Sequence, residues 1–431
     1  MHARRRPPQL PVARLMAAEA AAGMPLPAVQ AALRKTTELL AHELARPGAQ
    51  APDWTESEWR VARAVVAIHG VSGLLAGTLR WQGPAGWRPF LEEQRAQIAQ
   101  RLPRIQALLR ELDSRARACG LALVALKGAA LHAQGVYAAG ERPMADVDLL
   151  VAEADAARAA QLITELGFTA GLVNWKHRTF ELPGSAELAT TLGEHSSNAL
   201  KIELHSRIHE LLPLRPVDIS SLVLPRDARA GLNAYPSRAA LLLHLLLHAA
   251  GAMMGRSLRL LNLHDLALLT RDMTPADWDD LLAQGATTPD GSLWWAFPPL
   301  TLVHRYYRCV PEALLARTAR GCRWPLRSAA RRRLLSDVSL SYLWISAFPG
   351  IEWSRSWREL TAYAAVRVRP RTETLALREA FARSQPLVNG GEWAATSQGR
   401  RIARWLLARQ PRQESLQPVR ASLVRPTDPA A

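Results

Sequence analysis

Cysteine is scarce in this chain of 431 residues, which contains only Cys119, Cys309 and Cys322. An odd number of cysteines with no closely spaced pair excludes a disulfide framework and gives no zinc-binding pattern. The composition therefore favours a protein of a reducing compartment such as the cytoplasm.

Long apolar runs are equally few. The longest, residues 239–254, contains His244 and His248 and falls short of the ~20 residues that a membrane-spanning helix needs. The basic N-terminal segment is interrupted by proline and lacks an extended apolar core, so it is a poor signal peptide. We expect a cytoplasmic protein without a transmembrane segment.

Positive charge is abundant instead. The chain has 54 lysine and arginine residues against 38 aspartate and glutamate residues, a formal net charge of +16. Such an excess favours anionic partners, among them nucleotides, nucleic acid and acidic membranes. A coding bias towards arginine explains the same number, so the net charge alone leaves both interpretations open.

Hydrophobic periodicity divides the chain into five parts. A disordered basic tail at residues 1–12 precedes a helical N-terminal region at 13–119. Residues 120–235 alternate short strands and helices, including a hairpin, and indicate a small mixed sheet with covering helices, which is an α+β fold. Residues 236–408 are helical again, and the proline-rich polar residues 409–431 indicate a second disordered tail.

The most informative segment spans residues 121–151, whose pattern predicts a strand, a Lys-Gly turn, a helix, a loop and a second strand. The second strand carries Asp146 and Asp148, one residue apart. Because side chains alternate along a strand, both carboxylates project from the same face. Two adjacent acids are stabilised when they share a hard cation, so we expect Mg²⁺ here. Solvent-facing acids at the start of a strand are the alternative.

Further residues can complete a site for phosphate chemistry. Glu203 lies on the alternating strand at residues 200–205, which can pair beside the first two acids and supply a third carboxylate. Lys127, Arg142 and the backbone of Gly128 at a helix start can contact phosphates. His205, on the same face as Glu203, can form a hydrogen bond that orients the acids, or it can contact the substrate.

Each of these residues also has a purely structural interpretation. Glu203 can be an exposed strand residue, and Lys127 can cap the end of a strand. Arg142 can pair with an acidic neighbour in a surface ion pair, and His205 can be a hydrogen-bonded core histidine.

These residues resemble the DNA polymerase β-like nucleotidyltransferase superfamily, and most closely its branch called uncharacterised nucleotidyltransferase. The resemblance covers about residues 105–285. Its motifs are, in chain order, Leu126-Lys127-Gly128, Tyr137, Arg142, the DVDLLV run that begins at Asp146, Glu203-Leu204-His205, His248, Arg259-Leu260 and Asp265-Leu266-Ala267. Two positions depart from the pattern: Lys127-Gly128 replaces a Gly-Ser turn that holds phosphates in better-known members, and Glu203 replaces an aspartate.

The resemblance implies Mg²⁺-dependent transfer of a nucleoside monophosphate from an NTP to a hydroxyl or phosphate acceptor, with two metal ions if the protein is active. It assigns catalysis and metal binding to Asp146, Asp148 and Glu203. It assigns nucleotide binding to Lys127, Gly128 and Arg142. The acceptor stays open, with a peptide or sugar biosynthetic intermediate as the implied class.

Two alternatives to an enzyme remain. The missing Gly-Ser turn is compatible with a catalytically inactive binding module on the same fold. The excess of positive charge is compatible with a basic nucleic-acid-binding protein.

Overall fold

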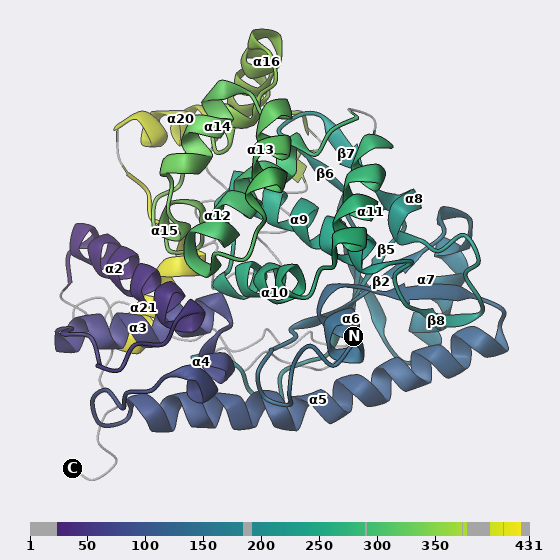
Figure 1. Ribbon diagram of the computed structural model, residues 1–431, viewed down its shortest axis with the longest axis horizontal. Coiled ribbons are helices and arrows are strands. Elements are labelled where there is room, and N and C mark those ends of the chain that lie inside the picture. The colour runs from purple at the N-terminus through teal and green to yellow at the C-terminus, as the bar shows by residue number, and fades with distance from the viewer. Residues whose placement is uncertain are drawn as a thin grey trace, which may run out of the picture.

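The structure is a computed structural model that describes residues 24–183, 192–288, 291–372, 374–376, 397–407 and 409–423. The basic tail expected at residues 1–12 lies outside these ranges. The described chain combines a six-stranded mixed sheet with helical regions on both sides of it in sequence (Figure 1). The expected α+β fold is confirmed.

The N-terminal region is helical, as its periodicity predicts. Its described helices are α2 (Leu26–Ala45), α3 (Glu56–His69), α4 (Ser72–Thr78) and α5 (Trp87–Ala118). Thr55 and Glu58 form a capping box at the start of α3, which satisfies two backbone donors that a helix start leaves unpaired. Helix α5 contains Pro103 and runs along one side of the whole molecule (Figure 1).

The mixed sheet has the strand order β3-β4-β5-β2-β1-β8. Its strands are β1 (Ala122–Ala125), β2 (Asp146–Val151), β3 (Thr169–Val173), β4 (Arg178–Glu181), β5 (Lys201–His205) and β8 (Gly231–Asn233). Strands β2 and β5 pair in parallel, with Asp148 directly opposite Glu203. The strand of Glu203, which its alternation predicts, therefore lies beside the strand of the two aspartates.

Short elements connect these strands. They are α6 (Lys127–Ala133), the 3-10 turn Glu153–Asp155, α7 (Ala156–Glu165), the two-stranded ribbon β6 (His209–Leu211) and β7 (Pro216–Asp218), and α8 (Ser220–Val223).

The two faces of the sheet have different surroundings. Val147, Leu149 and Val151 pack in a core with residues of α5 and α7. Side chains alternate along β2, so Asp146 and Asp148 lie on the opposite face. That face turns toward the C-terminal helices, and the acids therefore lie between the sheet and the helical region.

The C-terminal helical region packs around α9 (Arg238–Gly255), most of which is buried. This helix is long and apolar enough to cross a membrane, but 67% of its apolar window is buried inside the fold. The helices that follow are α10 (Leu260–Arg271), α11 (Pro275–Ala286), α12 (Phe297–Tyr307), α13 (Glu312–Gly321), α14 (Trp324–Arg332), α15 (Leu335–Val338), α16 (Trp357–Val368), α20 (Gln398–Leu407) and α21 (Gln413–Leu423), with 3-10 turns at Trp294–Ala296 and Ile351–Trp353.

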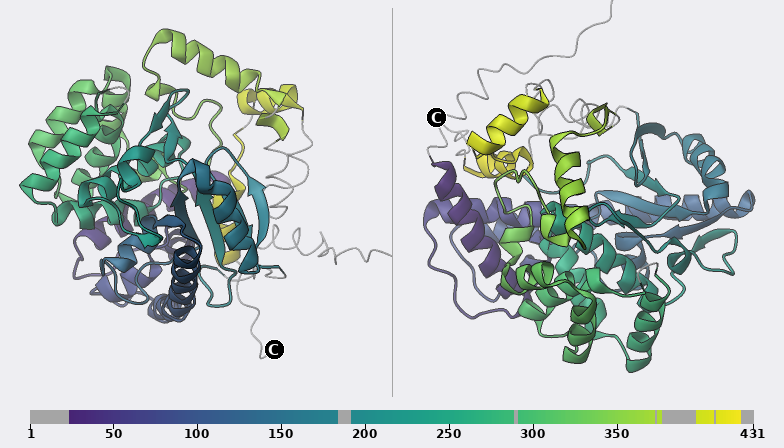
Figure 2. Two further views of the ribbon diagram at one scale, coloured as in Figure 1. Left: turned by 90° about the vertical axis from the view of Figure 1, so that its right-hand side faces the viewer. Right: turned by 90° about the horizontal axis from the view of Figure 1, so that it is seen from above.

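The expectation of a disordered tail from residue 409 is wrong for α21. This helix packs against α3 near the other end of the chain, and Figure 2 shows it (yellow) beside the N-terminal helices (purple). Leu416 and Val419 are buried there. Each buried apolar side chain stabilises the packed state by roughly 1.5–3 kcal/mol. Tertiary packing therefore stabilises a helix that the polar composition does not predict.

Candidate active site

Asp148 is the most enclosed of the three acids. Its Oδ1 accepts hydrogen bonds from Lys127 Nζ at 2.7 Å and from His205 Nε2 at 3.0 Å, and the residue is only 6% exposed. Burial alone would raise the pKa of Asp148, but the Lys127 ammonium and the His205 hydrogen bond lower it well below its ordinary value. Asp148 is therefore ionised at neutral pH.

The other two acids are harder to ionise. Burial and the neighbouring charge of Asp148 raise the pKa of Asp146. Burial, together with the charges of Asp146 and Asp148, raises the pKa of Glu203 to about 9. Three carboxyl groups on one face thus carry more negative charge than their surroundings neutralise, which is the electrostatic condition for a cation site.

Lys127 is the cation that faces these acids. It begins α6 with φ 46°, a backbone conformation uncommon outside glycine, and its backbone N–H donates to the Tyr235 hydroxyl at 3.3 Å. Burial would lower the pKa of Lys127, but the three acids raise it above the ordinary value. Lys127 is therefore a fixed positive charge beside Asp148.

Gly128 is required by the packing of the same turn. A Cβ at this position would lie 2.2 Å from Nη1 of Arg142 and 3.0 Å from the Met144 side chain. The Lys-Gly sequence is thus explained locally: the lysine supplies the charge, and the glycine leaves room for the arginine.

Arg142 is held by a residue far away in the sequence. Its Nε and Nη2 donate to the two carboxylate oxygens of Asp265 at 2.9 and 2.8 Å, and the Tyr137 hydroxyl donates to Asp265 at 2.6 Å. The pair is buried, with side-chain exposures of 8% and 1%. Because Asp265 neutralises the guanidinium, Arg142 is less available for phosphate than its sequence position suggests, and its partner is neither Glu141 nor Asp146.

Two histidines support the acids from the edge of the site. Asn174 Oδ1 accepts from the backbone N–H groups of Lys176 and His177, so its amide nitrogen must face His177 Nε2, at 2.9 Å. Nε2 therefore accepts, and the proton of neutral His177 resides on Nδ1, which lies 3.2 Å from Glu203 Oε2. Burial lowers the pKa of His177 to about 4 and also lowers the pKa of His205, so both imidazoles are neutral. His205 donates to Asp148, whereas His177 Nδ1 lies near Glu203 without a hydrogen bond.

Metal-ligand atoms gather around Glu203. Among the described residues, such atoms lie within 4.8 Å of one another in His177, Glu203 and His205, and neither Asp146 nor Asp148 joins this set. Since the protonated Nδ1 of His177 cannot ligate, the oxygen atoms of the acids are the better donors, and oxygen donors suit Mg²⁺. The donor chemistry of Asp146, Asp148 and Glu203 suits such an ion, but their oxygen atoms do not all lie within 4.8 Å of one another, and Asp148 is already paired with Lys127.

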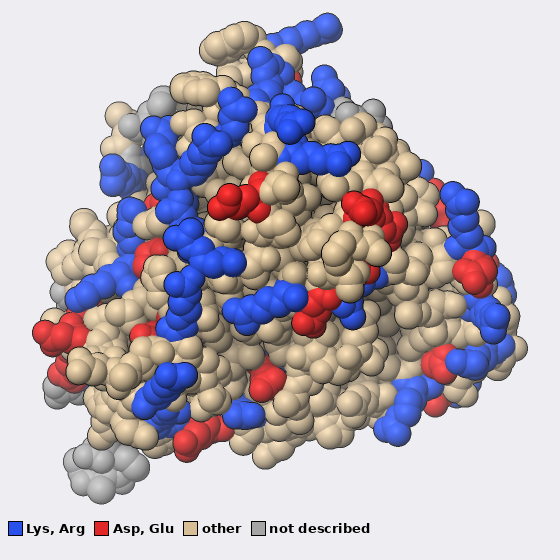
Figure 3. Space-filling view, in the orientation of Figure 1, with Lys and Arg blue, Asp and Glu red and all other residues tan. Residues whose placement is uncertain are grey.

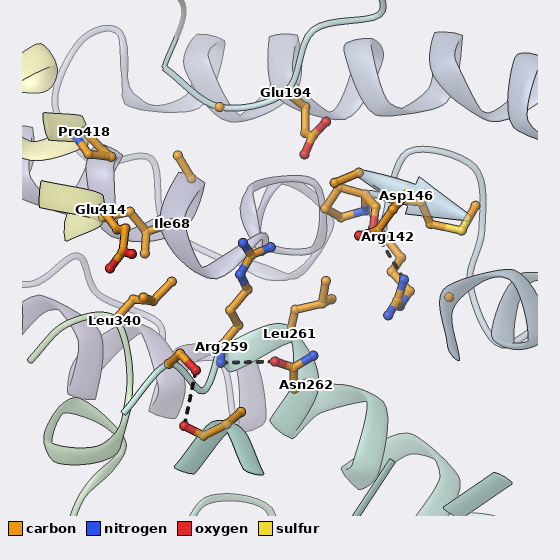
Figure 4. Close-up of a pocket in the computed structure, with 18 of the residues that line it drawn as sticks. Ile68, Arg142, Asp146, Glu194, Arg259, Leu261, Asn262, Leu340, Glu414 and Pro418 are labelled. Carbon is orange, nitrogen blue, oxygen red and sulfur yellow. Dashed lines mark hydrogen bonds between the residues drawn. The ribbon is translucent and has the colours of Figure 1, made fainter. Parts of the chain in front are cut away.

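A pocket of about 840 Å³ opens over the acids. Figure 4 shows Asp146 and Glu194 at one end, Arg259 reaching into the middle, and Glu414 and Pro418 at the other end. Burial raises the pKa of both Asp146 and Glu194, and the nearby positive charge of Arg259 opposes that rise. Arg259 is therefore close enough to act on charge at the acidic end.

A smaller cavity of about 150 Å³ continues from the same place. Both cavities are lined by Lys127, Glu203 and His248. The site thus has two compartments that meet at the third carboxylate.

Sequence reasoning missed several of these residues. Asp265 and Arg259 fell within recognised motifs, but nothing in their spacing reveals contact with a segment more than 100 residues earlier. His177 and Glu194 lie in loops without a pattern. Asn174, which lies just after β3, carries a weak signal, because asparagine is common in tight turns.

The sequence profile of the family described as uncharacterised nucleotidyltransferase matches residues 55–289. The match includes α3, α4 and, of the C-terminal helical region, α9, α10 and α11, and so begins earlier than the motifs alone indicate. No curated protein and no solved structure matches the chain. With the profile covering more than half of its length, the chain belongs to the uncharacterised nucleotidyltransferase family.

Proposed function

We propose that the protein transfers a nucleoside monophosphate from an NTP to a hydroxyl or phosphate group of an acceptor, using Mg²⁺. The observation that carries the proposal is the placement of Asp146, Asp148 and Glu203 side by side on β2 and β5, at one end of a pocket large enough for a nucleotide. Membership of a nucleotidyltransferase family supports the reaction class.

The acids and bases of the pocket have separate roles in this reaction. Asp146 and Asp148 would hold Mg²⁺, which neutralises the triphosphate and polarises the phosphorus under attack. Arg259 and Lys127 bind phosphate oxygens. Arg142 keeps a supporting role, because its charge is already committed to Asp265.

Glu203 is placed to accept the proton of the acceptor group. The acceptor oxygen forms a bond to the α-phosphorus, the bond from that phosphorus to the bridging oxygen breaks, and pyrophosphate leaves with the electron pair. The pKa of Glu203 is raised to about 9, so its carboxyl is protonated at neutral pH in the protein alone. A cation held at Asp146 and Asp148 would lower that pKa and free the carboxylate to act as the base. His205 holds the Asp148 carboxylate in place by donating to it, and the neutral His177 lies beside Glu203.

The position of the label in the products tests this reaction. ATP radiolabelled at the α-phosphate or at the γ-phosphate is incubated with Mg²⁺, the protein and a cell extract that supplies acceptors. We expect the α-label to become attached to an acceptor while the γ-label leaves as pyrophosphate. Asp148→Asn should abolish the transfer, and Glu165→Gln, an exposed acid on α7, should not. Transfer of the γ-label instead would replace the proposal with phosphoryl transfer.

A ligand-binding module without catalysis is the second candidate, and Lys127 is the observation that favours it. Its ammonium lies 2.7 Å from Asp148, where it neutralises part of the charge that a metal ion would neutralise. This candidate predicts that NTP binding is independent of Mg²⁺ and that neither label is transferred.

A further inference from the structure

The wall of the large pocket that lies away from the acids is built by α21, a helix outside the family region. The family profile ends at residue 289, whereas α21 begins at Gln413. The chain therefore returns, after more than 100 further residues, to line the same pocket as Asp146.

Helix α21 is fixed in place by its other face. Ser415 Oγ donates to the Leu340 carbonyl at 2.5 Å, and the Arg412 N–H donates to the Leu343 carbonyl at 2.6 Å. Leu416 and Val419 are buried against the body of the protein. A helix anchored in this way presents its remaining face to the pocket with little freedom to move.

That remaining face carries amide side chains. Gln413, Gln417 and Ala421 follow one another at intervals of four and so lie on one side of the helix, and all three line the pocket. A glutamine amide offers a donor and an acceptor side by side. This pairing matches the edge of adenine, which glutamine and asparagine recognise with two parallel hydrogen bonds.

The same pocket also has apolar side chains in its wall. Ile68 of α3 and Leu340, together with Pro418 of α21, lie beside Glu414 at one end, away from Asp146 and Glu194 (Figure 4). A nucleobase has two apolar faces and a polar edge, so it requires apolar walls with amides at their rim. The triphosphate of the same molecule would then extend past Arg259 to the acids.

We propose that α21 forms the nucleobase subsite of this pocket, with Gln413 and Gln417 selecting adenine. The inference rests on the proposed function, since it assumes that an NTP occupies the pocket. It adds to that function a substrate class, ATP, and a recognition element that the family region does not contain.

The test is the nucleotide selectivity of the full chain. Calorimetric titrations with ATP, GTP, CTP, UTP and inorganic tripolyphosphate, each with Mg²⁺, are compared for the wild type, Gln417→Ala, the Gln413→Ala/Gln417→Ala double variant and the control Gln161→Ala, an exposed glutamine on α7. We expect the wild type and the control to prefer ATP. The double variant should lose about tenfold in ATP affinity and keep its affinity for tripolyphosphate, which has no base.

The isosteric variant Gln417→Glu guards against a folding artefact. It removes a donor and keeps the size of the side chain, so ATP affinity should fall while tripolyphosphate affinity and thermal stability are retained. If the double variant and Gln417→Glu bind NTPs with the same nucleotide selectivity as the wild type, the assignment of α21 is overturned. The proposed function would then still stand. Absence of NTP binding by the wild type overturns the proposed function itself and the subsite with it.

Discussion

Asp265 connects the sheet to the C-terminal helices through one buried carboxylate. It accepts two hydrogen bonds from Arg142 and one from Tyr137. Both residues follow α6, whereas Asp265 lies on α10. The loop that leads into the acids is therefore positioned by an ion pair with the helical region.

Removing this carboxylate should be costly. Asp265→Ala leaves the buried Arg142 guanidinium without a partner, and we expect a loss of roughly 3–5 kcal/mol in the free energy of unfolding, measured by urea denaturation. The double variant Arg142→Met/Asp265→Leu, which removes both charges, should recover much of that loss. A loss below ~1 kcal/mol in Asp265→Ala would show that the pair does not hold the two regions together.

Removing the charge of Lys127 should change the affinity for metal and the affinity for nucleotide in opposite directions. Its ammonium repels a divalent cation near Asp148 but attracts phosphate. We expect Lys127→Met to bind Mn²⁺, as a stand-in for Mg²⁺, more tightly in the absence of nucleotide, and to bind ATP more weakly. Calorimetry measures both affinities, with Lys35→Met, a lysine that pairs with Glu58 at the surface, as the control. Equal shifts in the same direction would contradict the proposed position of Lys127.

At the scale of single residues, the sequence predicts the acids well and their partners poorly. The spacing of Asp146 and Asp148 on a strand reveals their common face, and the alternation around Glu203 reveals its strand. The partner of Arg142 is 123 residues away, and only the packing of α10 against the turn brings the two together. Contacts of that kind have no local pattern.

Among the helices, α3 and α10 are joined by a buried histidine at the end of α3. His69 is 0% exposed, its Nδ1 accepts the Leu260 N–H at 2.9 Å, and its Nε2 lies 2.8 Å from Ser341 Oγ. Burial lowers the pKa of His69 to about 3. The folded protein therefore requires a neutral imidazole, which the unfolded chain does not.

Because of His69, the free energy of unfolding should decrease as the solution becomes acidic. The unfolded chain takes up a proton below pH ~6.5, whereas the folded protein resists it down to about 3. The contribution of His69 to the free energy of unfolding is greatest above pH ~6.5. It is lost as the pH falls toward the pKa of the folded state, at up to ~1.4 kcal/mol per pH unit. In urea denaturation between pH 7.5 and pH 4.5, His69→Gln should be less stable at the upper pH but lose less on acidification. Parallel pH profiles of the variant and the wild type would contradict this role.

The elements around the acids were predictable, and α21 was not. Apolar alternation and the Lys-Gly turn predict β1, α6, β2 and β5. In these elements the local conformational propensity agrees with the structure that the tertiary fold requires. Helix α21 contains Pro418, which local rules treat as a helix breaker. Its helical state depends on packing against α3, more than 300 residues earlier.

Across the whole molecule, the positive charge is unevenly distributed. Residues 291–431 contain 23 arginines and nine acidic residues, so they carry +14 of the net +16. A coding bias acts along the whole gene and does not explain this concentration. On the face drawn in Figure 3, basic side chains gather over the upper part, where α14 and α16 lie.

This distribution predicts affinity for polyanions through the C-terminal region. We expect binding to single-stranded RNA that weakens steeply between about 50 and 200 mM salt, measured by fluorescence anisotropy. Arg331→Gln/Arg332→Gln, which removes two exposed charges near the end of α14, should weaken it more than Arg80→Gln/Arg110→Gln, which removes two exposed charges from the N-terminal region. Equal effects of the two pairs, or binding that ignores salt, would contradict a role for this region.

The most direct test of the account is a calorimetric titration of the protein with ATP in the presence of Mg²⁺ and again with a chelator. The wild type and Glu165→Gln should bind ATP with equal affinity when Mg²⁺ is present and more weakly without it. Asp146→Asn should lose at least about tenfold, equivalent to ~1.4 kcal/mol, because one of the two aspartates proposed to hold the ion is gone. Absence of ATP binding in the wild type, or binding that neither the chelator nor Asp146→Asn changes, would contradict the assignment of these acids to a metal-dependent nucleotide site.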